Sequence, residues 1–228
     1  MNKMETLEKI KSGLVVSCQA LEEEPLHSSF IMGRMAYAAS LGGAAGIRAN
    51  SVSDITEMKK IVDLPIIGIV KQDYDDSPVR ITPTAKEVES LIAIGVDIIA
   101  TDATLRTRTG GASLEEFFVP LRKKYPNQIF MADCATFEEC ENAKRLGFDI
   151  VSTTLRGYTE NTKGFAIPDY DLLKKLVKEL DMPVIAEGGI WSPEQLKQAM
   201  DCGVWCAVVG TAITRPMDIT KRYVAAIK

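Results

Sequence analysis

The sequence predicts a single (β/α)8 barrel, the TIM-barrel architecture, with a short helix at its N-terminus. Short apolar runs alternate with amphipathic segments along all 228 residues. The runs are rich in Val, Ile and Ala and lack polar alternation, which indicates parallel strands that are covered on both faces. Counting yields eight strand–helix pairs in a row, and this number fits one barrel of this length.

The expected elements follow one another without a linker, a low-complexity segment or a domain boundary, so we expect one domain over residues 1–228. The expected strands span residues 14–18, 44–48, 66–71, 97–101, 129–133, 149–153, 183–187 and 205–209. The expected helices span residues 3–11, 28–41, 51–61, 84–94, 113–124, 136–146, 169–180, 192–202 and 216–227.

Local signals support these elements. In segments 94–100, 146–152 and 202–208 a helix ends, a glycine takes the left-handed conformation, and a buried strand begins at once. A doubly wound sheet is the alternative architecture, but it rarely runs through eight regular units, and no Gly-x-Gly-x-x-Gly follows the first strand. Residues that suit helix N-caps are Ser51, Ser53, Thr82, Ser113 and Ser192.

Composition argues against several classes of protein. The net charge of −4 does not suit a nucleic-acid groove or a basic membrane-binding face. Five cysteines in no paired spacing and one histidine suit neither a disulfide framework nor a zinc site, and we expect no metal. The apolar run 14–16 before Cys18 is too short for a signal sequence, and no window is long enough to span a membrane. We therefore expect a cytoplasmic protein.

Polar residues at the carboxyl ends of the strands are the candidates for chemistry, because ligands of such barrels bind at that end. Gln19, Lys71, Asp133 and Glu187 all end odd-numbered strands. These side chains continue the inward apolar face of each strand into a polar top layer. The even-numbered strands end at Arg48, at Thr101 and Asp102, and at Thr153 and Thr154.

Lys71 and Glu187 follow strands on opposite sides of an eight-stranded barrel, so we expect them to face each other across its mouth. Two acid/base groups placed in this way can take a proton from one face of a carbon and return one to the other face. Burial and a nearby cation such as Arg48 would lower the pKa of Lys71 enough for it to act as a base. Three alternatives remain: a structural Lys71–Glu187 ion pair, a Schiff-base aldolase at Lys71, and a regulatory domain that only binds a sugar phosphate.

The last two strands carry the signal for a phosphate. The apolar runs 184–190 and 208–213 both contain glycines, which let the backbone N–H groups approach a ligand closely. We expect the phosphate of a small metabolite at Gly189, Gly210 and Thr211, with a charged hydrogen bond from Arg215. The cationic loop 105–111 is either a lid over this substrate or a solvated loop.

At these residues the chain resembles the N-acetylmannosamine-6-phosphate 2-epimerase family of bacterial sialic acid catabolism, over essentially its whole length. The Ser-Cys-Gln, Ile-Arg-Ala-Asn and Ile-Val-Lys motifs together are far more specific than the glycine-rich turns. The motifs that carry the resemblance lie at 16–20, 46–50, 68–73, 100–104, 131–134, 152–155, 186–190 and 209–216.

The resemblance implies an isomerase that interconverts N-acetylmannosamine 6-phosphate and N-acetylglucosamine 6-phosphate without a cofactor. We also expect the protein to form a homodimer. The resemblance implies that Lys71 and Glu187 are the acid/base residues. Arg156 differs from the family pattern, in which a small residue is commoner. The remaining roles that it implies are sugar binding by Gln19, Arg48, Asp133 and Thr154, and phosphate binding by Gly189, Gly210, Thr211 and Arg215.

Overall fold

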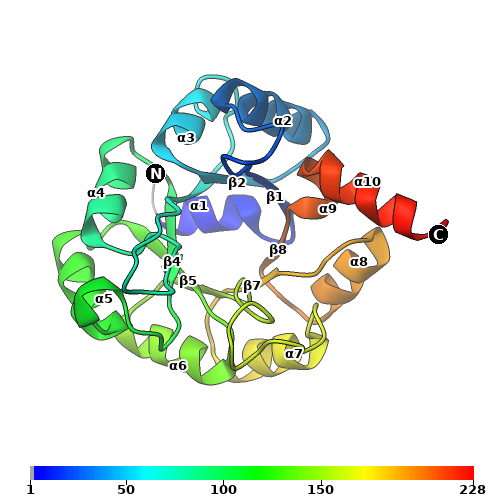
Figure 1. Ribbon diagram of the computed structural model, residues 1–228. Helices are drawn as coiled ribbons and strands as arrows, with labels where there is room; N and C mark the ends of the chain where they lie inside the picture. Colours follow the sequence, from blue (N-terminus) through cyan, green and yellow to red (C-terminus); the bar gives the residue numbers. More distant parts are fainter. Residues whose placement is uncertain (1–2) are drawn as a thin grey trace.

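In the computed structural model, which describes residues 3–228, eight parallel strands close into one barrel in chain order. The helices surround this barrel (Figure 1). The ring closes where β1 pairs with β8, with Val16 opposite Val209. The predicted (β/α)8 barrel is therefore confirmed. The strands are β1 (Leu14–Cys18), β2 (Gly46–Asn50), β3 (Ile66–Ile69), β4 (Ile98–Asp102), β5 (Ile129–Asp133), β6 (Ile150–Ser152), β7 (Val184–Glu187) and β8 (Cys206–Val209).

The nine predicted helices are present, most of them shorter by one to three residues. The sequence patterns did not predict two further short helical elements, η1 (Thr109–Gly111) and α9 (Thr211–Thr214). The others are α1 (Lys3–Ile10), α2 (Ser29–Leu41), α3 (Val52–Met58), α4 (Ala85–Ala93), α5 (Leu114–Lys124), α6 (Phe137–Leu146), α7 (Tyr170–Glu179), α8 (Pro193–Asp201) and α10 (Pro216–Ala225).

The barrel interior is filled by side chains that alternate along the strands, as the sequence predicts. Ile67 and Ile69 of β3 and Ile129 and Met131 of β5 belong to one buried interior cluster. Lys71 and Asp133 continue the same alternation toward the carboxyl ends of these strands. The apolar layers thus provide a rigid floor for the polar residues above them.

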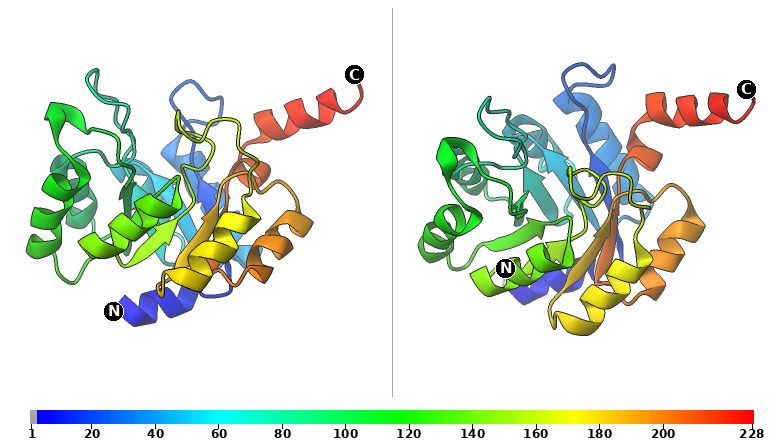
Figure 2. Two further views of the ribbon diagram at one scale, coloured as in Figure 1. Left: turned by 90° about the horizontal axis from the view of Figure 1, so that it is seen from below. Right: turned by 60° about the horizontal axis from the view of Figure 1, so that its bottom comes forward.

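The N-terminal helix closes the other end of the barrel. Leu7 and Ile10 of α1 join the interior cluster, and the indole Nε1 of Trp205 donates to the Leu7 carbonyl at 2.9 Å. Figure 2 shows α1 at the end of the barrel opposite the long loops. Helix α1 therefore covers the barrel interior at this end.

The helix-to-strand glycines are confirmed, and two expected N-caps are wrong. Ser53 lies within α3, which Ser51 caps. Gly95, Gly147 and Gly203 have φ of +64°, +92° and +86°, in the left-handed region that favours glycine. Thr84, not Thr82, caps α4, in a capping box with Glu87. The chain before α4 first runs back past Lys71, which Ile81 bridges, so the N-cap lies two residues later than expected.

Two strand boundaries differ from the prediction in ways that move site residues. Strand β2 starts at Gly46 instead of residue 44, because the turn before it includes the N–H of Ala45 donating to the Leu14 carbonyl at 2.8 Å. Arg48 is consequently the middle residue of β2 instead of its last. Strand β3 ends at Ile69, and the Lys71 N–H donates to the side chain of Asn50 at 2.8 Å.

None of the helices in residues 3–228 has the length and apolar character that crossing a membrane requires.

Candidate active site

A pocket of about 510 Å³ opens at the carboxyl ends of the strands. Its wall contains eight of the ten residues that the sequence predicts for the site. Arg48 and Asp133 are not part of this wall. The eight residues are Gln19, Lys71, Thr154, Glu187, Gly189, Gly210, Thr211 and Arg215.

Arg48 lies beneath the pocket and joins three strands. Its side chain is 1% exposed and points into the barrel, because its neighbours Ile47 and Ala49 pack outward against the helices. The guanidinium donates to both oxygens of Asp133, at 3.1 and 2.5 Å, and to Glu187 at 2.9 Å. The bidentate contact fixes the position and the orientation of Asp133, and the single hydrogen bond holds one oxygen of Glu187.

Thr154 completes this network from the loop after β6. Its hydroxyl lies 2.7 Å from one oxygen of Asp133 and 3.0 Å from Glu187. One hydroxyl proton serves one of these acceptors at a time. Thr154 and Arg48 therefore hold Glu187 from two sides, while Asp133, which is fully buried, anchors Arg48.

Lys71 lies at the pocket wall, two residues beyond the end of β3. It makes no ion pair with any residue from 3 to 228, and Glu187 pairs with Arg48 instead. The alternative of a structural Lys71–Glu187 ion pair is therefore wrong. Burial, followed by the positive charges of Arg48, Arg215 and Arg80, lowers the pKa of Lys71 to about 8. The predicted lowering of the Lys71 pKa by the charge of Arg48 is therefore confirmed.

The pKa of Glu187 is shifted in the opposite direction, upward. Burial and the nearby Asp133 carboxylate raise its pKa to about 7, against the lowering effects of Arg48, Thr154 and Lys71. The pocket thus contains an amine and a carboxyl group that both change protonation near neutral pH. This matching of pKa to the operating pH is what general acid–base catalysis requires.

Arg215 lies at the other end of the pocket, at the start of α10. Its Nε donates to Glu24 at 2.8 Å, and its Nη2 donates to the second oxygen of the same carboxylate. Glu24 also accepts from the Leu21 N–H at 2.7 Å, so this carboxylate ties the loop after β1 to the loop after β8. The sequence does not single out Glu24, because this residue stands in a run of three glutamates with nothing to distinguish it.

The glycines at this end have different constraints. Gly189 has a φ of +72°, and a Cβ there would lie 2.6 Å from the side chain of Ile167. A Cβ on Gly210 would lie 3.1 Å from Ser17. Gly189 is thus required by backbone conformation and packing, in addition to any contact with a ligand.

Gln19 contributes an unused acceptor. Its Nε2 donates to the Ser17 hydroxyl at 2.8 Å, whereas its Oε1 is buried without a partner among the described residues. A buried acceptor without a partner is costly, and a hydroxyl or amide N–H of a substrate would satisfy it.

The cationic loop after β4 is bound to its neighbour. The Ser77 hydroxyl donates to the Thr107 carbonyl at 2.9 Å, and the Gly110 N–H donates to Asp76 at 2.8 Å. Arg106 reaches the pocket wall, whereas Arg108 is buried and stacks on an aromatic ring. Of residues 105–111 only Arg106 lines the pocket, and Leu105 is 67% exposed. The lid over the substrate stays a prediction.

Other polar candidates face away from the pocket. Arg156, the position that differs from the family pattern, donates to Asp169 at 3.0 and 2.6 Å. Asp73, in the acidic segment formed by residues 73–76, pairs with Arg80. Among residues 3–228 no group of three or more His, Cys, Asp and Glu side chains is arranged to hold a metal ion.

Comparison with known proteins identifies the family. A sequence model of the family described as "Putative N-acetylmannosamine-6-phosphate epimerase" matches residues 32–228. The chain belongs to this family. It is 49% identical over 226 residues to a relative from Caldanaerobacter subterraneus subsp. tengcongensis, with 99% of this chain and 95% of the relative covered. A relative from Borreliella afzelii is 54% identical over 224 residues, with 97% of each chain covered.

Both relatives are named "Putative N-acetylmannosamine-6-phosphate 2-epimerase". The solved structure of the N-acetylmannosamine-6-phosphate 2-epimerase from Clostridium perfringens superimposes with a TM-score of 0.92 at 52% identity. The match covers 96% of this chain and 95% of that one. The family membership and the barrel that the sequence motifs imply are therefore confirmed.

Proposed function

We infer that this chain is a carbohydrate epimerase that interconverts N-acetylmannosamine 6-phosphate and N-acetylglucosamine 6-phosphate. The observation that carries this inference is the placement of Lys71 and Glu187 on opposite strands of one pocket, both with a pKa near neutrality. The names of the relatives agree with this reaction. None of them describes an aldolase, and no feature of the pocket favours one.

The proposed reaction proceeds through the open-chain sugar, in which the C1 aldehyde acidifies the proton on C2. One of the two residues removes this proton, and the electron pair of the C–H bond moves into a C1–C2 double bond with negative charge on the C1 oxygen. The other residue then delivers a proton to the opposite face of C2, and the carbonyl reforms. In the reverse direction the two residues exchange roles.

We assign the remaining contacts as follows. Gln19 and Thr154 bind the sugar from the pocket wall, and the free Oε1 of Gln19 accepts from it. Gly189, Gly210, Thr211 and Arg215 bind the phosphate. Direct contact of Arg48 and Asp133 with the sugar stays a prediction, since the side chains of both are at most 1% exposed.

A direct test follows the two sugar phosphates by proton and phosphorus NMR, with a chelator present. We expect either epimer to be converted to the same equilibrium mixture, and unphosphorylated N-acetylmannosamine to be a poor substrate. Loss of activity with the chelator would contradict a reaction that needs no metal. Cleavage of the sugar, or a lysine adduct trapped by borohydride, would contradict the epimerase.

We also propose that the protein is a homodimer that joins through α10 and α2. Helix α10 projects from the barrel beside α2 (Figures 1 and 2). Both helices expose large apolar side chains, including Phe30 (60% exposed) and Leu41 (72%) on α2 and Tyr223 (75%) on α10. Apolar surface of this kind is typical of an interface. Analytical ultracentrifugation should give a dimer that Tyr223→Glu weakens, and a monomer at assay concentration would contradict the proposal.

We propose a cytoplasmic location, because all five cysteines are free, which suits a reducing compartment. Cell fractionation tests this location, and recovery of the protein outside the cytoplasmic fraction would contradict it.

A further inference from the structure

The end of the pocket opposite the proposed phosphate site carries a second built group of polar side chains. Strand β4 lies across the eight-stranded ring from β8. Asp102, the last residue of β4, and Arg106, in the loop after it, both line the pocket. The reaction proposed above uses neither residue. They pair with each other, and within the described pocket lining Arg106 also reaches the Pro78 carbonyl.

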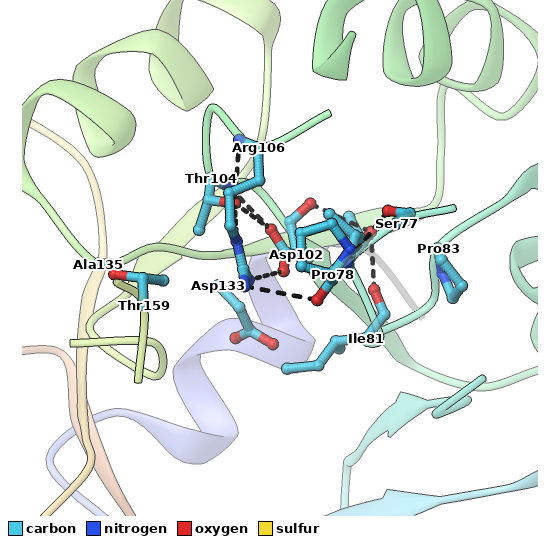
Figure 3. Close-up of polar contacts among 12 residues, drawn as sticks. Ser77, Pro78, Ile81, Pro83, Asp102, Thr104, Arg106, Asp133, Ala135 and Thr159 are labelled. Atoms are coloured by element: carbon cyan, nitrogen blue, oxygen red, sulfur yellow. Dashed lines mark hydrogen bonds and ion pairs between the residues drawn. The ribbon is translucent and has the colours of Figure 1, made fainter. Parts of the chain in front are cut away.

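Hydrogen bonds to both carboxylate oxygens fix the side chain of Asp102. Its side chain is 2% exposed and points inward like Ile98 and Ala100 of the same strand. One carboxylate oxygen accepts from the N–H and the hydroxyl of Thr104, at 3.0 and 2.7 Å. The other accepts from Arg106 Nη2 at 2.5 Å. Figure 3 shows Arg106, Asp102 and Thr104 bonded to one another.

Arg106 keeps donors for a ligand. Its side chain is 27% exposed, its Nε donates to the Thr104 hydroxyl at 3.0 Å, and its Nη1 reaches only the Pro78 carbonyl, at 3.4 Å. A guanidinium has five N–H donors, so these contacts leave donors that can turn toward the pocket. The positive charge is already balanced by Asp102, so this end suits a neutral acceptor better than a second anion.

Apolar side chains surround these donors. Pro78, Ile81 and Leu155 line the same pocket. The wall is rigid, because Arg108 Nη1 donates to the Pro83 carbonyl at 2.9 Å and so joins the loop after β4 to the loop after β3. A fixed hydrogen-bond donor beside apolar surface suits a group with one carbonyl oxygen and one methyl.

The geometry points to Arg106 as the residue that recognises the acylamino group of the substrate, by donating to its carbonyl oxygen. Pro78 and Ile81 cover the methyl of this group, and Asp102 positions Arg106. The assignment rests on the proposed function: with C2 between Lys71 and Glu187 and the phosphate at β7 and β8, the C1–C2 end of the open chain lies toward β4, within reach of Arg106.

The test compares two open-chain ligands that differ only at C2. They are the 6-phosphates of N-acetylglucosaminitol, which has an acetamido group there, and of glucitol, which has a hydroxyl. Calorimetry gives both dissociation constants for the wild type, for Arg106→Met and for Arg106→Lys. The ratio of the two constants within one preparation does not depend on how much of a variant is folded.

We expect Arg106→Met to lower the preference for the acetamido ligand by roughly tenfold, as for the loss of one hydrogen bond from a charged donor. Arg106→Lys, which keeps a charge beside Asp102, should lower it less. If both ligands weaken by the same factor, or neither changes, the assignment is overturned. If the wild type binds neither ligand, the proposed function itself fails.

Discussion

Two arginines of the site are both paired with carboxylates, but in different surroundings. Arg48 is 1% exposed, and the carboxylates it binds, Asp133 and Glu187, lie on other strands of the barrel. Arg215 is 30% exposed and is held by Glu24, a loop residue. The contacts of Arg48 with the two carboxylates, here called the inner network, are fixed by the strands of the barrel. The Arg215–Glu24 ion pair, here called the outer pair, depends on the position of two loops. We therefore assign the inner network to the proton transfer and the outer pair to substrate capture.

The largest effects should come from Glu187, which belongs to the inner network, and from Lys71, which lies beside it at the pocket wall. Lys71→Met and Glu187→Gln should each lower kcat by roughly 10²- to 10⁴-fold, the usual contribution of a positioned acid or base. KM should change little, because neither residue holds the phosphate. Steady-state kinetics and circular dichroism melting measure activity and fold together. The matched variant Arg215→Met should instead raise KM and keep most of kcat, and the opposite pattern would break the division between the two regions.

The next largest difference should be between the effects of the two arginines on the free energy of unfolding. Arg48→Met leaves Asp133 buried without its partner and should lower the free energy of unfolding by about 3–5 kcal/mol. Arg215→Met removes a partly exposed pair and should cost at most about 1 kcal/mol. Urea denaturation measures both, and Arg48→Lys controls for the charge of the inner site. Equal losses of unfolding free energy in the two methionine variants would show that the inner network contributes no more to stability than the outer pair.

The pH dependence of kcat/KM, which reports the acid and base of the free enzyme, sharpens the assignment of the inner site. The active enzyme has one proton shared between Lys71 and Glu187, on either residue according to the direction of the reaction. Activity should fall below about pH 7, where Glu187 is protonated as well, and above about pH 8, where Lys71 loses its proton too. Kinetics across this range, with a carbon-13 NMR titration of Glu187, tests this. A carboxyl that titrates near pH 4 would contradict it.

The smallest effect should come from the loop that holds Arg215. Without Glu24 the guanidinium loses its fixed orientation, so Glu24→Ala should raise KM about fivefold at most, the value of a partly exposed pair. Glu24→Gln, which still accepts a hydrogen bond, should raise KM less. Steady-state kinetics at two salt concentrations checks this. A lower KM in Glu24→Gln would show that the carboxylate competes with the phosphate instead of positioning Arg215.

The sequence predicts the parts of this site that depend on periodicity. The alternation of Ile129, Met131 and Asp133 places the carboxylate on the inner face of β5, and the same reasoning places Glu187 on β7. Strand order in a closed barrel then brings residues from distant parts of the chain together. These inferences need only local pattern and topology, so they hold in the structure.

The parts that depend on long-range contacts could not be predicted. The start of β2, and hence the depth of Arg48, depends on a turn bonded to the Leu14 carbonyl. Arg106 and Arg108 are two residues apart in one loop, yet only Arg106 reaches the pocket. Their local sequence does not distinguish them. Arg108 is the buried one because it packs against Phe117, a contact that only the folded chain makes.

The central claim is that protons reach C2 from two residues on opposite faces. Turnover of N-acetylmannosamine 6-phosphate in deuterium oxide, followed by proton NMR, tests it most directly. The account predicts one deuterium at C2 of each N-acetylglucosamine 6-phosphate formed. In Lys71→Met and Glu187→Gln it predicts exchange at C2 without inversion, each variant acting on a different epimer. Interconversion that leaves the original hydrogen at C2, or near-normal turnover by either variant, would contradict the account.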